Sequence, residues 1–151
     1  MLDTAVGIVG EYKILSGSKY NIQWLAQDST EFPGTNLISR EKWLTPRDCK
    51  VGLHCQVLFA LNGTAQGDRQ VFNLYFTRNG SRILHGSKSA LFVATGNNDE
   101  NTIAVDWYGK LEKNDVIGVT VEYKEGGNGG VSLLLDVGCR FAVEIFDDPA
   151  N

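Results

Sequence analysis

The residues best suited to proton transfer or nucleophilic attack are two histidines, His54 and His85. His54 precedes Cys55 in an apolar segment, and His85 lies two residues before Ser87, so a Cys–His or Ser–His pair is conceivable. Neither spacing supports such a pair, and the chain has no nucleophile elbow, phosphate-binding loop or dinucleotide fingerprint. We therefore expect no enzymatic activity. A pocket that binds or converts a small molecule would require these histidines to converge with acidic residues.

The three cysteines, Cys49, Cys55 and Cys139, indicate thiols rather than a structural cross-link or a zinc site. An odd number at scattered spacing is not a disulfide framework, and no Cys-x-x-Cys pair or histidine cluster accompanies it. Cys55 and Cys139 lie in apolar segments, where a thiol packs as a small hydrophobic group. We expect thiols in a reducing compartment, with a Cys49–Cys55 disulfide as the alternative.

One polar loop, 97–100 (Asn-Asn-Asp-Glu), offers the oxygen ligands that calcium prefers. The spacing of a calcium-binding EF-hand loop is absent, so a solvated loop is favoured over a calcium site. Asn62-Gly63-Thr64 and Asn79-Gly80-Ser81 match N-glycosylation acceptors, but Asn-Gly is also the preferred pair of a tight hairpin turn. We expect turns at both, and we expect no metal and no cofactor.

The overall charge argues against nucleic acid as a partner. The net charge is −4, and this mildly acidic chain contains no cluster of lysine or arginine. Binding to nucleic acid depends on positive side chains that neutralise its phosphates. The N-terminal residues 1–15 contain an acid and no basic stretch, so we expect no signal peptide. No apolar run approaches the roughly 18 residues of a membrane span. We expect a protein made in a cytosol, with no membrane partner.

Alternating apolar residues predict strands throughout, separated by turns rich in glycine and asparagine. No stretch predicts a helix of convincing length, because the best one, 39–49, contains Pro46. The pattern predicts one all-β antiparallel sandwich of the jelly-roll kind over residues 19–151, with residues 1–18 as an N-terminal arm or edge strand. The expected strands are 21–26, 53–61, 69–78, 82–85, 90–94, 101–108, 116–124, 131–137 and 140–146.

Two of these strands are apolar on both faces, although a sandwich strand normally has one face in water. In 56–61, Val57 and Phe59 are on one face and Leu58 and Ala60 on the other. In 131–135, Leu134 is on the face opposite to its apolar neighbours. The second face must be covered, either by the N-terminal segment or by another subunit. A second subunit is the favoured interpretation and the main argument for oligomerisation from sequence.

The order of these segments resembles the tumour-necrosis-factor and complement-head type of jelly roll. The resemblance is carried by 43–57 (WLTPRDCKVGLHCQV), 69–81 (RQVFNLYFTRNGS), 109–121 (GKLEKNDVIGVTV), 132–136 (SLLLD) and 140–146 (RFAVEIF). The step Leu111–Val116 matches the family's Leu-x-x-Gly-Asp-x-Ile/Val pattern, with Asn114 where glycine is usual. Asparagine is the next best residue for a left-handed turn, so this departure is mild.

The resemblance implies compact homotrimers that bind ligands along loops and subunit seams. Similar domains occur in bacteriophage virions, so we expect a virion protein, a trimeric capsid decoration or cement protein whose partner is a major capsid protein. The alternative is a receptor-binding head of a phage fibre that recognises a host glycan or surface protein. Trp43 is interpreted either as an exposed anchor for a partner or as packing over the open end of the sandwich. The candidate interface residues are Val6, Ile8, Val9, Trp43, Val57, Phe59, Tyr75 and Leu134.

Overall fold

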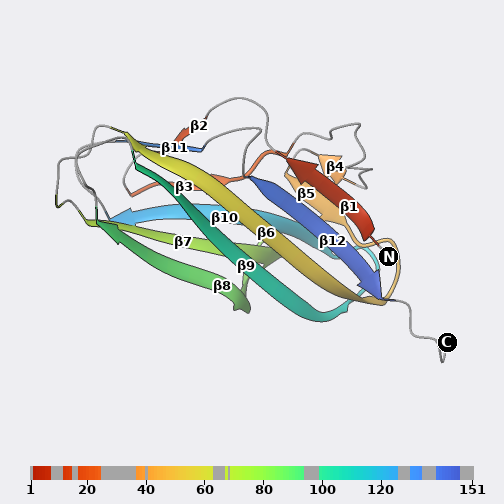
Figure 1. Ribbon diagram of the computed structural model, residues 1–151. Helices are drawn as coiled ribbons and strands as arrows, with labels where there is room; N and C mark the ends of the chain where they lie inside the picture. The colour runs from red at the N-terminus through yellow and green to blue at the C-terminus, as the bar shows by residue number, and fades with distance from the viewer. Residues whose placement is uncertain are drawn as a thin grey trace.

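The computed structural model describes residues 2–7, 12–14, 17–24, 37–39, 41–62, 67, 69–93, 99–125, 130–133 and 139–146. Over these residues the fold contains strands and no helix, and therefore no helix that could cross a membrane. The strands form two antiparallel sheets packed face to face (Figure 1). The all-β sandwich expected from the sequence is confirmed.

Sheet A is organised around one long strand, β6. This strand pairs along its whole length with β9 on one side, and with β12 and then β11 on the other. β1 extends the sheet beyond β12, and β2 extends it beyond β11. The N-terminal residues 2–7 are thus an edge strand of the sandwich. The strands of sheet A are β1 (Leu2–Gly7), β2 (Tyr12–Ile14), β6 (Cys49–Asn62), β9 (Asp99–Leu111), β11 (Gly130–Leu133) and β12 (Arg140–Phe146).

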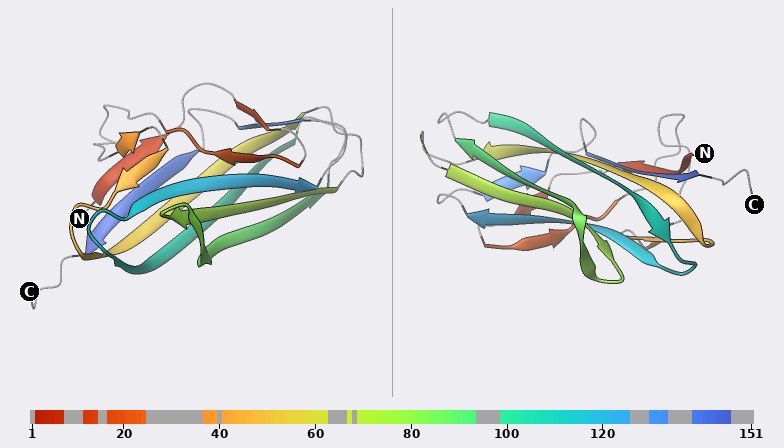
Figure 2. Two further views of the ribbon diagram at one scale, coloured as in Figure 1. Left: turned by 180° about the vertical axis from the view of Figure 1, so that it is seen from behind. Right: turned by 90° about the horizontal axis from the view of Figure 1, so that it is seen from below.

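Sheet B has a similar plan, with β10 and β7 at its centre. β10 pairs with β7 along one side, and with β5 and β3 along the other. β8 pairs with β7 and forms one edge, and β4 lies beyond β5. Figure 2 shows this sheet from behind and from below. Its strands are β3 (Lys19–Asn21), β4 (Leu37–Ser39), β5 (Lys42–Leu44), β7 (Arg69–Arg78), β8 (Ser81–Val93) and β10 (Val116–Glu125).

The core fills the space between the sheets with the apolar side chains that the period-two pattern predicts. Phe72 of β7 is central, because its ring lies 4.6 Å from that of Phe59 and 4.7 Å from that of Tyr123. At the other end Phe141 lies 5.6 Å from Trp24 and 6.2 Å from Phe76. Such tilted and stacked pairs add about 0.5–1.5 kcal/mol each beyond the area they bury.

The turn residues adopt the conformations that their types favour. Asn79 and Gly80, between β7 and β8, have φ of 52° and 84°, which is the left-handed pair of a tight hairpin turn. Asn114, between β9 and β10, has φ of 72°, which is the left-handed conformation that asparagine tolerates better than most residues. The Asn-Gly-Ser sequence at 79–81 is a tight turn, as expected.

Four of the expected strands differ from the observed ones. The expected strands 82–85 and 90–94 are parts of one strand, β8, which pairs with β7 on both sides of residues 83–86. The expected strand 21–26 begins earlier and is shorter, with only Lys19–Asn21 paired to β10. β11 covers 130–133, and residues 134–137 of the expected strand lie outside the described residues.

Three connections meet at one buried carboxylate, that of Asp115. Its Oδ2 accepts a hydrogen bond of 2.8 Å from the Glu112 amide and lies 2.7 Å from the Arg78 guanidinium. Its Oδ1 accepts a hydrogen bond of 2.9 Å from the Asn79 side chain. Its backbone carbonyl accepts two bonds of 2.9 Å from Thr45, one from the amide and one from the hydroxyl. We call this set the Asp115 node.

Two effects act on the pKa of Asp115 in opposite directions. Desolvation of the buried carboxyl raises the pKa, but the hydrogen bonds from Glu112, Asn79 and Arg78, together with the arginine charge, lower it by more. The folded-state pKa is therefore below the ordinary aspartate value. This difference stabilises the folded state fully above the unfolded pKa, and the stabilisation is lost as the pH falls through the folded pKa.

We expect Asp115→Asn to destabilise the protein by about 1–3 kcal/mol at pH 7, because three charge-assisted contacts lose their anion. Urea denaturation at several pH values measures this. The difference from wild type should shrink below about pH 4, where the wild-type carboxylate becomes protonated.

Glu112→Gln is the matched control, since it removes the same charge from an exposed side chain in the same turn. It should change stability by less than about 0.5 kcal/mol. Equal effects of the two substitutions at pH 7 would contradict the role of the node.

Candidate functional site

Four of the eight candidate interface residues have described side chains, and three of these are interior residues. Trp43, Val57 and Phe59 are fully buried between the sheets within a single chain. Trp43 is thus a packing residue, which was one of its two interpretations. Tyr75 lies on the outer face of sheet B, where it is 7% exposed because the Arg82 guanidinium lies 4.5 Å above its ring centre. The backbone of Val6 is in β1, and Ile8, Val9 and Leu134 lie outside the described residues.

The two-faced strand 56–61 is covered within one chain to a large extent. Val57 and Phe59 point into the core, Ala60 on the opposite face is 5% exposed, and Leu58 is half-buried. The Leu58 amide also donates to the Cys139 thiol at 3.4 Å. This strand therefore does not require a second subunit to cover it.

The exposed outer face of sheet A carries a histidine between two carboxylates. His54 of β6 lies between Asp106 of β9, which is directly opposite it, and Glu144 of β12, which is diagonal to it because Glu144 pairs with Gly52. Nδ1 is 2.7 Å from Asp106 Oδ1, and Nε2 is 3.4 Å from Glu144 Oε1. Nε2 is buried, and the contact with Glu144 lacks hydrogen-bond geometry, so this nitrogen has no hydrogen-bond partner among the described residues. A neutral imidazole carries one N–H and can donate to only one of the two acids.

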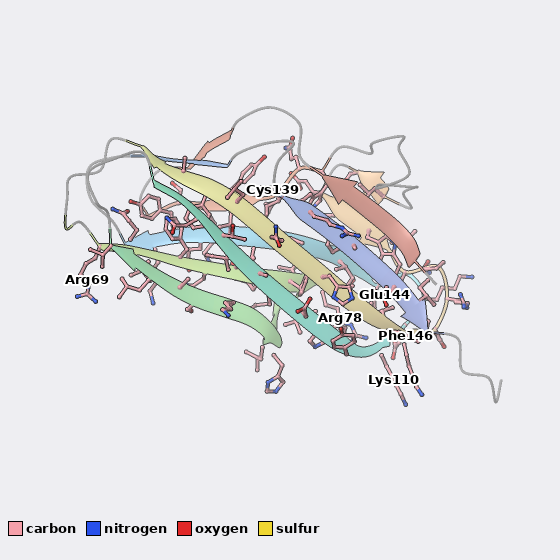
Figure 3. The ribbon with its side chains drawn as sticks, viewed as in Figure 1. Arg69, Arg78, Lys110, Cys139, Glu144 and Phe146 are labelled. Atoms are coloured by element: carbon pink, nitrogen blue, oxygen red, sulfur yellow. The ribbon has the colours of Figure 1, made fainter. Side chains whose placement is uncertain are left out.

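Two aromatic side chains extend this face toward the end of the sandwich. Tyr108 is 64% exposed and meets the His54 ring edge-on at 5.5 Å, and Phe146 is 42% exposed with its ring 6.3 Å from that of Tyr108. A side chain at Gly52 would bring its Cβ within 2.9 Å of the Tyr108 ring, so glycine lets the ring lie flat on the sheet. Glu144, Phe146 and Lys110 lie at this same end (Figure 3). We call Tyr108 and Phe146 the aromatic patch.

A second exposed apolar surface lies on the edge strand β8. Ser87 pairs with Tyr75 and Arg82 pairs with Thr77, so the four residues Ile83–Gly86 stand opposite a single residue of β7. This bulge bends out of the sheet (Figure 2) and carries Leu84, which is 81% exposed. Its base is closed by Ser87, whose hydroxyl donates to the Ile83 carbonyl at 3.0 Å and accepts from Arg82 Nε at 2.8 Å.

Further along β8, Leu91 and Val93 are also at least half exposed. Together with Leu84 they form what we call the β8 edge.

The histidine pairs considered from the sequence are placed apart. His54 and Cys55 are consecutive in a strand, so their side chains point to opposite faces, and Cys55 is buried in the core. His85 is exposed on the β8 bulge, and the Ser87 hydroxyl is bonded to Ile83 and Arg82. His54 alone converges with acids. Over the described part of the chain, no group of three or more His, Cys, Asp or Glu side chains could hold a metal ion. Of the loop 97–100, residues 97 and 98 lie outside the described part.

The aromatic patch and the β8 edge did not emerge as candidates from the sequence. A signal for the first was present, because the period that buries Ile103 and Val105 also turns Tyr108 outward, and the period that buries Phe141 turns Phe146 outward. No local signal predicts the bulge that exposes Leu84, because it depends on the register between β7 and β8. The sequence matches no protein-family model and no curated protein sequence.

The three cysteines are thiols. Cys49 and Cys55 lie on the same strand, about 20 Å apart at roughly 3.3 Å per residue, which is too far for a disulfide. Burial raises the pKa of the Cys55 thiol well above its ordinary value, and Cys139 and Asp106 raise it further. Burial also raises the pKa of Cys139 to about 11, partly offset by a backbone hydrogen bond with Leu58.

We therefore expect one thiol, that of half-buried Cys49, to react quickly with Ellman's reagent at pH 8 in the native protein. All three thiols should react after denaturation in guanidinium chloride. Cys49→Ser should remove the fast phase and leave two slow thiols. Fast reaction of two or more thiols in native wild-type protein would contradict the burial of Cys55 and Cys139.

Proposed function

We propose that the chain is a non-enzymatic viral structural protein, a jelly-roll domain that assembles as a homotrimer and decorates a capsid built by a major capsid protein. Its location would then be the virion, after synthesis in the host cytoplasm. The observation that carries the assembly is the presence of two separate exposed apolar surfaces, the aromatic patch and the β8 edge. The virion role rests on the family resemblance of the sequence.

The strand order supports the jelly roll. A jelly roll winds eight strands so that the first pairs with the last, the second with the seventh, the third with the sixth and the fourth with the fifth. With β1, β5, β6, β7, β8, β9, β10 and β12 taken as these strands, all four pairs are present: β1 with β12, β5 with β10, β6 with β9, and β7 with β8. The short strands β2, β3, β4 and β11 are additions to this plan.

The two apolar surfaces support a ring rather than a simple dimer. A two-fold dimer uses the same patch on both subunits, whereas a ring joins two different patches head to tail. The aromatic patch lies on the outer face of sheet A, and the β8 edge belongs to sheet B. In the proposed trimer the face of sheet A that carries Tyr108 and Phe146 packs against β8 of the next subunit, with Leu84 as the most exposed side chain of that edge.

We expect light scattering on purified protein to give about 50 kDa, three times the subunit mass of 16.6 kDa. Tyr108→Ser and Leu84→Ser should each shift the protein toward monomer, because an anchor at the centre of an interface contributes about 2 kcal/mol or more. Lys113→Ser, in the exposed β9–β10 turn, is the control and should remain trimeric. A stable 16.6 kDa monomer at micromolar concentration would overturn the assembly.

Mixing the two interface variants tests the head-to-tail arrangement. Tyr108→Ser retains the β8 edge and Leu84→Ser retains the aromatic patch, so an equimolar mixture should form heterodimers of about 33 kDa, twice the subunit mass, with no closed ring. Native mass spectrometry distinguishes these species when one variant is isotopically labelled. Failure to form heterodimers would indicate an interface between identical patches.

The second candidate function is a receptor-binding head of a phage fibre. It is favoured by a polar hollow on the outer face of sheet B, whose lining includes none of the exposed apolar residues of the aromatic patch or the β8 edge. Neighbouring genes for capsid proteins would support decoration, and neighbouring genes for fibre proteins would support the receptor-binding head.

A further inference from the structure

The outer face of sheet B is a grid of polar side chains in register across its strands. Opposite each other on β10, β7 and β8 lie Glu122, Asn73 and Ser89 in one row, and Thr120, Tyr75 and Ser87 in the next. β3 adds Lys19 to the first of these rows and Asn21 to the second. A third row consists of Lys42 of β5, Gly118, Thr77 and Arg82, since β5 pairs with β10 in the register that places Lys42 opposite Gly118. We call this third row the Lys42 row.

The first row is fully bonded within itself. The Ser89 hydroxyl donates to Asn73 Oδ1 at 2.5 Å, and the Asn73 amide donates to Glu122 Oε1 at 2.8 Å. Lys19 Nζ lies 3.7 Å from Glu122 Oε2. These side chains have partners along the whole row, so the row needs nothing from outside.

The second row is likewise occupied. The Thr120 hydroxyl donates to Asn21 Oδ1 at 2.8 Å. Tyr75 lies under the Arg82 guanidinium, and Ser87 is bonded to Arg82 and Ile83. Arg82 is thus fixed at the edge of the grid by its stacking on Tyr75 and by its Nε bond to Ser87. Its terminal amino groups make no ion pair with any carboxylate of the described residues.

The Lys42 row differs because two of its side chains lack partners and its middle is empty. Over the described residues, the side chains of Lys42 and Thr77 make no hydrogen bond or ion pair. Between them Gly118 has no side chain, and a hollow of about 440 Å³ opens there, lined on this row by Lys42, Gly118, Thr77 and Arg82. That volume is within the range of about 300–1,000 Å³ for small-molecule sites.

Gly118 is required by the space in the hollow and not by its backbone conformation. Its φ is not in the left-handed region, so an ordinary strand residue would fit the backbone. A Cβ there would lie 2.9 Å from the Thr77 hydroxyl oxygen and 3.4 Å from the Glu41 carbonyl oxygen. Any side chain would fill the floor of the hollow and displace the Thr77 hydroxyl.

The charges around the hollow select an anion. Lys42 and Arg82 stand at opposite ends of the row, and neither is neutralised by a described carboxylate, whereas Lys19 is neutralised by Glu122. Two acidic residues also line the hollow: Glu122, which is paired with Lys19, and Glu41, which accepts a hydrogen bond of 3.4 Å from Gln23. The acidic side chains give the hollow hydrogen-bond acceptors beside the cations Lys42 and Arg82.

We propose that this hollow binds an acidic saccharide, with the sugar's carboxylate or sulfate between Lys42 and Arg82. The Thr77 hydroxyl and the Glu41 carboxylate supply a donor and an acceptor for ring hydroxyls, which a bare anion would not use. The Glu41 charge also disfavours a small multiply charged anion held close to it. Gly118 lets the sugar ring approach the sheet.

This inference rests on the binding role proposed for the domain but not on its assembly. All the groups belong to β5, β10, β7, β8 and the turn before β5 of one subunit, so a monomer would bind equally well. Loss of the trimer and loss of saccharide binding are therefore separate outcomes.

The test is a glycan array that pairs sialylated, uronic and sulfated saccharides with their neutral counterparts. The acidic members should be retained at least about tenfold better than the neutral ones. The best of them is then titrated into ¹⁵N-labelled protein, and amide shifts should concentrate at Lys42, Thr77, Arg82 and Gly118. Inorganic sulfate is titrated in parallel and should bind at least about tenfold more weakly.

Lys42→Gln and Arg82→Gln should each weaken binding by about tenfold or more, the effect of one charge-assisted contact. Gly118→Val should abolish binding while it keeps a strand-forming residue in β10. Thermal unfolding shows whether each variant is folded. If Gly118→Val does not fold, Lys42→Gln still tests the proposal, because it changes only an exposed side chain. The matched control is Lys110→Gln, which removes the same charge from the end of the sandwich that carries Glu144 and Phe146 (Figure 3).

The control should bind like wild type. The proposal is overturned if no acidic saccharide is retained, if neutral counterparts bind as well, or if sulfate alone binds as tightly. It is also overturned if Lys110→Gln weakens binding as much as Lys42→Gln, because binding would then follow net charge.

Discussion

The buried carboxylate of Asp115 fixes one end of the sandwich. The carboxylate bonds the turn between β7 and β8 and the turn between β9 and β10, and the Asp115 backbone carbonyl bonds the segment after β5. These three segments are far apart in the sequence. Because β7, β10 and β5 share sheet B while β9 belongs to sheet A, the same group sets both the register within one sheet and the spacing to the other. A buried carboxylate is tolerated only with such partners. The rows on the outer face of sheet B depend on that register.

The two outer faces of the sandwich have different chemistry, although both belong to antiparallel sheets with one face on the core. On sheet A, the aromatic rings of Tyr108 and Phe146 lie beside His54 and its two acidic neighbours. On sheet B, the side chains are paired in two rows, whereas Lys42 and Thr77 of the third row have no hydrogen-bond or ion-pair partner among the described residues. That contrast is the basis for proposing assembly through one face and a small polar ligand on the other.

The sequence was sufficient for the sandwich and for most of its core. Alternation predicted that Phe72, Leu74 and Phe76 share a buried face, and they do. Alternation did not predict features that depend on which strands lie beside each other in the sheet. The apolar pattern of 56–61 indicated a missing subunit, but Ala60 is covered within the chain. The Lys42 row joins β5, β10 and the β7–β8 hairpin, which are separated in the chain, so no spacing along the sequence could place Lys42 and Arg82 on the same row.

The bulge at Ile83–Gly86 has a further consequence for the solubility of the protein. β8 is an edge strand, and an uninterrupted edge of unpaired backbone groups invites another chain to add a strand. Three extra residues bend the backbone out of the sheet near the start of β8, so no straight strand can pair along its full length. The edge can still contact a neighbour through the side chains that it projects. The bulge therefore directs association toward closed, side-chain-mediated contacts and away from open-ended growth of the sheet.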